Sequence, residues 1–451
     1  MKEQSYLKGA FIISAGGFIS KLLGALYRIP LIAFLGGEGM GIYQMVYPLY
    51  CILLTVSASG IPTGIARIIS SGQCTFAERP AMRLYGAVGL VGSLVMFALS
   101  APLAKLQGEP AVELCCKLLA PSVFFVSVLS VVRGYFQGRG NMFPTAATEV
   151  AEQAIKVAFG LILCYIFRGD ALRGVAAAVF AVTLSEALSA CYAAVLYSRS
   201  NRSAVPLYYS PADHYKTILR FTVPLTFTAI AMPLSQLVES IVVVAILRGS
   251  SDNATALWGV FSGCAITLVN LPVSLTYGLA AAGVPKISPL AQSGDMAGAK
   301  SAAARAMLIT LAISLPCATA LFAFAPLAAD LIFRSLSSSE RTLLVALVRV
   351  MSINSVTLSL VQTSSACLTS LGKPVYGTVT QWVTSVLRVI LSSILVYFTG
   401  LSVRGAAISS NISYLVAVLL NLWYIIRVRG VKHEDNLDRI RHKARRFNAV
   451  G

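Results

Sequence analysis

Lys21 and Arg28 lie inside the first long apolar segment, near residues 8 to 34, and the next acidic residue is Glu38 beyond it. Because the two cations are seven residues apart, a helix would place them on nearly the same face, two turns apart. A cation at the centre of a bilayer costs about 2.5–3.5 kcal/mol on insertion scales, unless it faces water or an anion. The pair therefore predicts a binding site for a negatively charged ligand within a membrane.

The composition of the chain indicates the medium around this segment. Of the 451 residues, 57% are hydrophobic and only 12% are charged, and the mean hydropathy is +0.76. Soluble domains carry about 25% charged residues. We therefore predict an all-α integral membrane protein.

The apolar segments fall into two sets of six, separated by a polar stretch from Ser198 to Tyr215. A transmembrane helix needs about 20 mostly apolar residues. On this length the first six spans are expected near 8–34, 43–67, 84–104, 118–137, 147–167 and 174–197. The second six are expected near 217–247, 255–283, 304–329, 342–370, 375–399 and 405–426. The sequence thus predicts about 12 transmembrane helices.

The distribution of basic residues predicts the orientation. Most of the 36 Lys and Arg fall in the short loops on the side of the N-terminus or in the tail. The positive-inside rule then places both termini in the cytoplasm, with the chain in the cytoplasmic membrane. The same topology accounts for the formal charge of +18, so we expect no nucleic-acid binding. The basic tail, Arg427 to Arg446, is expected either to fix this topology or to bind anionic membrane lipids.

Residues suited to metal binding or catalysis are few. The nine cysteines are scattered without a CxxC pair, and His214, His433 and His442 lie in the predicted linker or tail. We expect no disulfide framework, no metal site and no cofactor. Because no Ser/His/Asp or Cys/His group can be assembled within the membrane, the chain is not expected to be an enzyme.

The two halves of the chain repeat. Residues 63–68 match 282–287, 101–104 match 325–328, and 172–177 match 403–408, in order and at a nearly constant offset. Lys156 corresponds in the same way to Arg388. Since each half has an even number of spans, the repeats run parallel, and a central site is expected between them. Two lobes that rock against each other for alternating access are the architecture of a transporter.

The first span carries the most specific resemblance to a known family. Residues 16–31 read GGFISKLLGALYRIPL and residues 35–43 read LGGEGMGIY. These segments resemble the stage V sporulation protein B family, in the polysaccharide-transporter branch of the multidrug/oligosaccharidyl-lipid/polysaccharide exporter superfamily. Gly60-Ile61-Pro62, residues 133–138 (RGYFQG) and Glu152-Gln153 with Lys156 extend the resemblance over essentially the whole chain.

The resemblance implies a fold and a substrate. It implies a V shape of two six-helix lobes, residues 1–200 and 217–428, with a cytoplasmic linker at 201–216 and a basic tail at 429–451. It also implies export of an undecaprenyl-diphosphate-linked saccharide, a peptidoglycan precursor of spore-cortex synthesis. A lipid diphosphate is a compact polyanion, so buried cations would lower the cost of moving it through a low-dielectric layer. We expect a monomer whose partners are this substrate and membrane lipids.

The resemblance to the related lipid II flippase branch is narrower. That branch opens with Ser-Arg-x-x-Gly-x-x-Arg and then an acid. Here Ser20, Lys21 and Gly24 align, but Tyr27 falls at the second arginine and Arg28 replaces the acid. Segments 43–66 and 255–283 also lack the basic residues of that branch. Lys21 and Arg28 are therefore predicted to bind substrate without the full arginine set.

Charges in other spans are further candidates for the site. Glu152 and Lys156 have the favourable i, i+4 order, so they form either an internal pair or a substrate contact. Glu239 lies deep in the second half and either binds a coupling ion, Na⁺ or H⁺, or is a paired structural glutamate. Arg349 and Arg388 are expected to line the cavity of the second lobe and to bind substrate.

The small and kinking residues of the first span are candidates for a gate. Gly16, Gly17, Gly24 and Pro30 suit either close helix packing or bending of the helix. Two other functions stay open at this stage. An antiporter of cationic drugs, coupled to Na⁺ or H⁺, would place acids and aromatic residues in its cavity, whereas the first span is basic. A membrane-bound glycosyltransferase would need a catalytic acid or a metal-binding motif near a membrane face. A non-transporting scaffold would need no such site.

Overall fold

The structure is a computed structural model that describes residues 6–58, 60–70, 78–200 and 211–428, all folded as helices joined by short turns. The side chains of some helical residues, among them Lys21 and the run 274–286, are not described. The first half contains α1 (Tyr6–Ala58), α2 (Ile61–Ser70), α3 (Glu78–Gln107), α4 (Ala111–Gly138), α5 (Phe143–Ile166) and α6 (Ala171–Ser198). The second half contains α7 (Pro211–Arg248), α8 (Ala254–Trp258), the π-helix η1 (Gly259–Ala265), α9 (Ile266–Gln292), α10 (Met296–Ile332), α11 (Ser338–Ser370), α12 (Pro374–Phe398) and α13 (Val403–Arg427).

Helix α1 contains two membrane crossings. Gly36 breaks it with φ 66° and ψ −168°, a left-handed conformation that glycine adopts without steric cost. Gly60, with φ 75°, then separates α1 from α2. Each of the twelve predicted spans is therefore found in order in the described residues.

Most of these segments are long and apolar enough to cross a membrane. Ten candidate spans are found by length and composition, and the first of them, Ala15–Ser70, holds the two crossings that meet at Gly36. Helix α5 is not among the ten, and it carries Glu149, Glu152 and Lys156. Since α5 packs along α6 and α1, it lies within the same helix bundle, and its charges are half-buried between helices.

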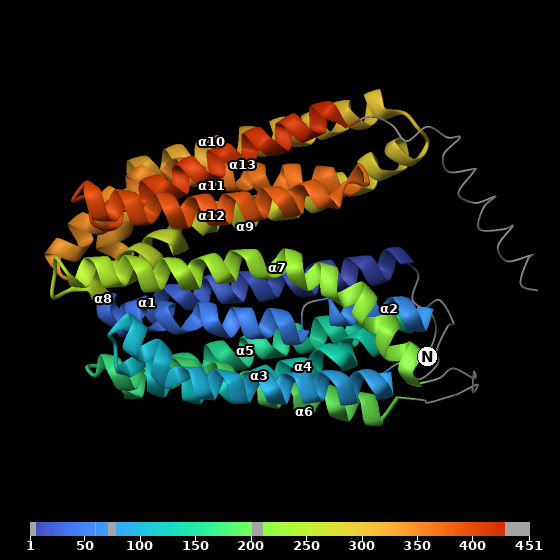
Figure 1. Cartoon of the computed structure of the whole chain (residues 1–451), viewed down its shortest axis with the longest axis horizontal. Coiled ribbons are helices and arrows are strands. Elements are labelled where there is room, and N and C mark those ends of the chain that lie inside the picture. The colour runs from blue at the N-terminus through green and yellow to red at the C-terminus, as the bar shows by residue number, and fades with distance from the viewer. Residues whose placement is uncertain (1–5, 59, 71–77, 201–210, 429–451) are drawn as a thin grey trace, which may run out of the picture.

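The packing within the two halves follows one pattern. In the first half α3 packs on α4, α5 on α6, and α4 on α6. In the second half α10 packs on α11, α12 on α13, and α11 on α13. The predicted repeat is thus confirmed in three dimensions. Figure 1 shows the two lobes as separate layers, with α1 beginning and α13 ending at the same end of the molecule and α8 at the other.

Helix α7 lies between the two lobes (Figure 1). Its contact with the first half includes a 2.7 Å hydrogen bond between the hydroxyls of Tyr85 and Thr222. Its contact with the second half includes the stacked rings of Phe227 and Trp382, whose centroids are 5.0 Å apart. Gln107 of α3 also donates to Ser240 of α7 at 3.0 Å. One helix is therefore shared by both lobes.

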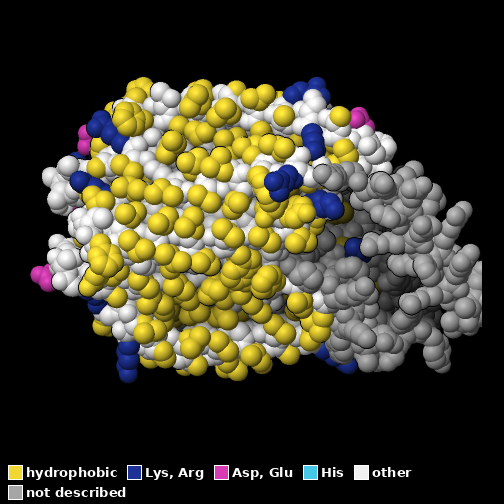
Figure 2. All heavy atoms as spheres, turned by 45° about the horizontal axis from the view of Figure 1, so that its top comes forward, with side chains coloured by type: hydrophobic (Ala, Val, Ile, Leu, Met, Phe, Trp, Pro, Cys, Tyr) yellow, Lys and Arg dark blue, Asp and Glu magenta, His cyan; other side chains and the backbone are white. Residues whose placement is uncertain are grey.

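The outer surface of the helix bundle is apolar. Figure 2 shows hydrophobic side chains covering the visible face between two ends toward which Lys and Arg gather. The exposed large side chains come from helices of both lobes and include Leu94, Ile162, Leu308, Phe324 and Phe398. Such a belt requires lipid around it. The chain is a multi-pass membrane protein, as predicted.

The predicted domain boundaries stay predictions. Residues 201–210 of the linker, and the whole basic tail 429–451, lie outside the described residues. His433 and His442 fall in that tail, and the side chain of His214 is likewise not described.

Candidate functional site

Arg28 lies where the two lobes meet. Its Nη1 donates a 3.1 Å hydrogen bond to Oγ1 of Thr267, which belongs to α9 in the second half. The side chain is half-buried and interacts electrostatically with Tyr43 and Tyr47 of α1 and with Lys156 of α5. The cation predicted from the first span therefore lies between the lobes and close to a second cation.

Glu152 is held by residues of α4 and α5. Nη2 of Arg133 is 3.0 Å from Oε2 of Glu152, and the two side chains are only 13% and 16% exposed. Nε of Arg133 donates to Thr148 at 3.0 Å, while Gln153 donates to the other carboxylate oxygen of Glu152 at 3.1 Å. Glu152 thus takes Arg133, and not its i+4 neighbour Lys156, as its ion-pair partner.

Lys156 and Glu186 complete this group of charges. Lys156 interacts electrostatically with Glu152, Glu186 and Arg28. Glu186 of α6 is buried and accepts a 3.4 Å hydrogen bond from the hydroxyl of Tyr50, while its second oxygen has no partner among the described atoms. We name Arg28, Arg133, Glu152, Lys156 and Glu186 the first-lobe charge cluster.

Neighbouring features frame the cluster. The rings of Tyr43, Tyr47 and Tyr50 follow one another along α1, with centroid separations of 5.4 and 5.7 Å. They connect the surroundings of Arg28 with those of Glu186. Glu149, one turn before Glu152, is half-buried and has partners of its own.

Glu239 and Arg388 form the corresponding pair in the second lobe. Nη2 of Arg388 is 3.1 Å from Oε2 of Glu239, with side-chain exposures of 8% and 5%. Arg388 also donates to the hydroxyl of Tyr414 at 3.3 Å and to Ser235 at 3.2 Å. The structure therefore places the glutamate predicted for ion coupling and an arginine predicted for substrate binding against each other.

Arg349 lies apart from both groups. It is exposed on α11, and its guanidinium is 5.7 Å from the ring centroid of Phe322 on α10, which is itself 53% exposed. We expect Arg349→Gln to change transport by less than about twofold, because an exposed cation over an aromatic ring contributes only about 0.5–1 kcal/mol. A transport or complementation assay, with equal amounts of both proteins in the membrane, checks this. Loss of transport would show that Arg349 belongs to the substrate site.

The gate candidates of the first span have different surroundings. A Cβ on Gly16 would lie 2.6 Å from that of Ala146, so this glycine lets α1 approach α5 closely. Gly17 has no atom within 4 Å of its hypothetical Cβ, and Gly24 faces Gln153 at 3.4 Å. The backbone of α1 stays helical at Pro30, and its non-helical residue is Gly36. Lys21 lies on α1, and the position of its side chain is not described.

The sequence interpretation missed Arg133 and Tyr50 as site residues, and it identified Glu186 as an intramembrane charge without a partner. The predicted span 118–137 contains Arg133, close to its end on the cytoplasmic side. In the structure α4 continues to Gly138, so Arg133 faces α5 inside the helix bundle. Its inclusion in an apolar span was the signal that could have identified it.

The comparisons with known proteins agree with this architecture. The family described as polysaccharide biosynthesis protein matches residues 6–291, which is more than half of the chain. The chain belongs to this family. Together with the relatives below, the match supports assignment to the multidrug/oligosaccharidyl-lipid/polysaccharide superfamily, whose members are transporters rather than enzymes.

Relatives and a solved structure support the same assignment. Stage V sporulation protein B of Bacillus subtilis is 28% identical over 306 residues, which are 64% of this chain and 59% of the relative. The lipid II flippase MurJ of the same organism is 24% identical over 319 residues, with the same two coverages. A multidrug resistance MATE family transporter, solved facing inward, is 18% identical with a TM-score of 0.76 over 90% of this chain and 94% of its own. Transporters of that kind have the predicted V-shaped, two-lobe fold.

Proposed function

We propose that the chain is a flippase that moves an undecaprenyl-diphosphate-linked saccharide across the cytoplasmic membrane by alternating access. The observation that supports this most directly is the position of Arg28, which is half-buried where the lobes meet and donates a hydrogen bond to Thr267 of the second half. We extend the proposal to a peptidoglycan precursor, because the relatives include a sporulation protein and a lipid II flippase. We propose that the chain acts as a monomer.

The charge cluster suits a lipid diphosphate. Arg28, Lys156 and Arg133 provide three cations in a low-dielectric region, where hydrogen bonds between guanidinium and phosphate are strong and geometrically specific. Glu152 keeps part of this charge balanced while no substrate is bound, through its ion pair with Arg133. Binding of a diphosphate would then replace carboxylates as the partners of these cations.

The direction of transport follows from topology. The positive-inside distribution places both termini in the cytoplasm, so the α8 end of the molecule would be the outer end. At this end Gln44 donates to the carbonyl of Ser262 at 2.7 Å, and Thr255 donates to Glu109 at 3.0 Å. These bonds join the two lobes, so with the proposed orientation the molecule would be closed at its outer end and would accept a precursor from the cytoplasm.

The ion pair in the second lobe argues against cation coupling at Glu239. Arg388 already supplies the positive charge that Na⁺ or H⁺ would bring to this carboxylate. A second cation would be repelled by the guanidinium at short range. We therefore propose that Glu239 is structural, and that the coupling ion of this transporter, if it has one, binds elsewhere.

A complementation experiment tests the proposed function. In a strain lacking its lipid-linked-precursor flippases, we expect the wild type to restore growth and Lys21→Ala and Arg28→Ala to fail. Each lost charge-assisted hydrogen bond should weaken diphosphate binding by roughly tenfold to a hundredfold. Arg173→Ala is the matched control, because this arginine is 73% exposed beside Asp170.

Two results would contradict the proposal. Normal rescue by the Lys21→Ala, Arg28→Ala double variant, at wild-type membrane levels, would exclude these residues from the substrate site. Resistance to cationic drugs without any rescue would instead identify a multidrug antiporter.

A further inference from the structure

We propose that the α8 end of the molecule is a gate with two parts, a glycine-lined crossing of α1 with η1 and a polar latch formed by Arg248, Glu109 and Thr255. The gate is a property of the protein without substrate, so it stands or falls separately from the proposed cargo. Both parts join the first lobe to the second. Opening toward this end must therefore break both.

The crossing brings two backbones into direct contact. A Cβ on Gly259 would overlap the carbonyl oxygen of Gly37 and would lie 2.5 Å from the backbone nitrogen of Gly41. A Cβ on Gly41 would likewise overlap the carbonyl oxygen of Thr255. Because these obstacles are backbone atoms, they cannot move aside as the end of a flexible side chain would. The closed crossing therefore requires glycine at 41 and 259.

The local structure of η1 suits a contact that opens and closes. Residues 259–265 form a π-helix, a wider and rarer turn that is frequent at functional sites. Met40 of α1 packs over Gly263 of η1, and a Cβ at Gly263 would lie 2.9 Å from that side chain. Small residues at a helix crossing let the two backbones approach closely.

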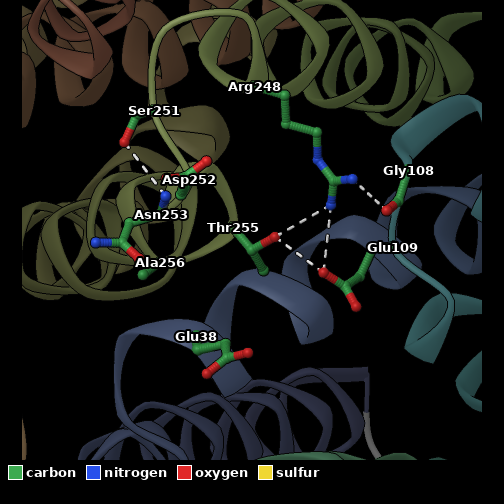
Figure 3. A pocket seen from close by; sticks show the side chains of 9 residues that line it. All are labelled: Glu38, Gly108, Glu109, Arg248, Ser251, Asp252, Asn253, Thr255 and Ala256. Atoms are coloured by element: carbon green, nitrogen blue, oxygen red, sulfur yellow. Dashed lines mark hydrogen bonds and ion pairs between the residues drawn. The ribbon is translucent and has the colours of Figure 1, made fainter.

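The latch lies beside this crossing. Arg248, at the end of α7, donates to the carbonyl of Gly108 and lies 3.3 Å from Oε2 of Glu109. Oγ1 of Thr255 donates to the same carboxylate oxygen at 3.0 Å (Figure 3). Gly108 and Glu109 belong to the turn between α3 and α4, whereas Arg248 and Thr255 belong to the second half. A single carboxylate thus holds two residues of the opposite lobe.

Water reaches the latch. A pocket of about 440 Å³ opens beside it, and its lining includes Glu38 and Asp252 (Figure 3). The side chains of Arg248 and Glu109 are 33% and 19% exposed. Ion pairs in contact with water are weak and break readily. The latch therefore closes the gate reversibly, while the glycine crossing determines how tightly the backbones meet.

The experiment uses a cysteine in the closed crossing as a reporter. Met40 is 1% exposed, so Met40→Cys in a full-length chain without its native cysteines should react slowly with a membrane-impermeant maleimide added to intact cells. Adding Gly259→Ala or Gly41→Ala should raise the labelling rate at least about fivefold, by shifting the population to the open state. Glu109→Gln should raise the rate by roughly twofold to fivefold, because it removes one water-exposed ion pair. Gly86→Ala, on α3 with open space around it, should leave the rate unchanged.

The outcomes separate the gate from a merely structural contact. Unchanged labelling in the glycine variants and in Glu109→Gln, with monodisperse protein, would overturn the proposal. If the glycine variants fail to fold, the charge exchange Glu109→Arg with Arg248→Glu provides the test. It should restore the ion pair and lower the labelling rate from that of Glu109→Gln toward that of Met40→Cys alone. Faster labelling only from the cytoplasmic side would also overturn it. No substrate is needed, so a failed complementation test leaves this result intact.

Discussion

Glu152→Gln is expected to tighten the binding of a lipid diphosphate, whereas Arg133→Gln is expected to weaken it, each by roughly tenfold. The two side chains form one ion pair, so a purely structural pair would give the same sign for both changes. In the proposed site, removing the carboxylate leaves Arg133 free for phosphate and raises the positive potential around Lys156. Removing the arginine leaves an unpaired carboxylate that repels the ligand.

Titration of the purified protein with undecaprenyl diphosphate in detergent, followed by native mass spectrometry, measures this difference. Arg173→Gln is the control, since it breaks an ion pair that is exposed on α6. Affinities that fall in both Glu152→Gln and Arg133→Gln would show that this ion pair supports the fold and not the ligand. Tighter binding by Glu152→Gln would also slow release, so faster turnover is not expected to follow.

Arg388→Ala is expected to destabilise the protein by about 3–5 kcal/mol, because it leaves the carboxylate of Glu239 uncompensated in a buried site. The double variant Glu239→Ala with Arg388→Ala should cost less than the sum of the two single variants, since neither charge is then left alone. Thermal unfolding in detergent provides the comparison.

Lys117→Ala is the matched control for this experiment. Lys117 and Glu113 form an ion pair at 2.6 Å, but the two side chains are 38% and 40% exposed. Exposed pairs of this kind contribute about 0–1 kcal/mol. Equal shifts in melting temperature for Arg388→Ala and Lys117→Ala would mean that the pair in the second lobe is solvated and is not a structural element.

The fold was predictable because the thickness of a membrane determines the length of each apolar segment. Each crossing needs an uninterrupted apolar run, and the parallel repeat follows from an even number of spans in each half. The break between the first two spans was predicted between residues 34 and 43, but its reduction to the single residue Gly36 was not, because Gly36 is one of 34 glycines.

The partners of the charges were less predictable than their presence. The i, i+4 spacing suggested Lys156 as the partner of Glu152, yet Arg133 lies closer because α4 packs against that face of α5. Arg388 and Glu239 meet although 149 positions separate them, and spacing within one helix gives no information on such contacts. Arg349 differs from Arg388 through the rotation of its helix, which directs it outward.

Helix α7 limits what the two lobes can do. It contacts α3 through Tyr85 and Thr222, and it contacts α12 through Phe227 and Trp382. If α7 moved rigidly with one lobe, its contact with the other lobe would have to slide or break. The amplitude of any movement between the lobes is therefore limited by how far α7 can bend or slide, and not by the strength of the contacts that close either end of the molecule.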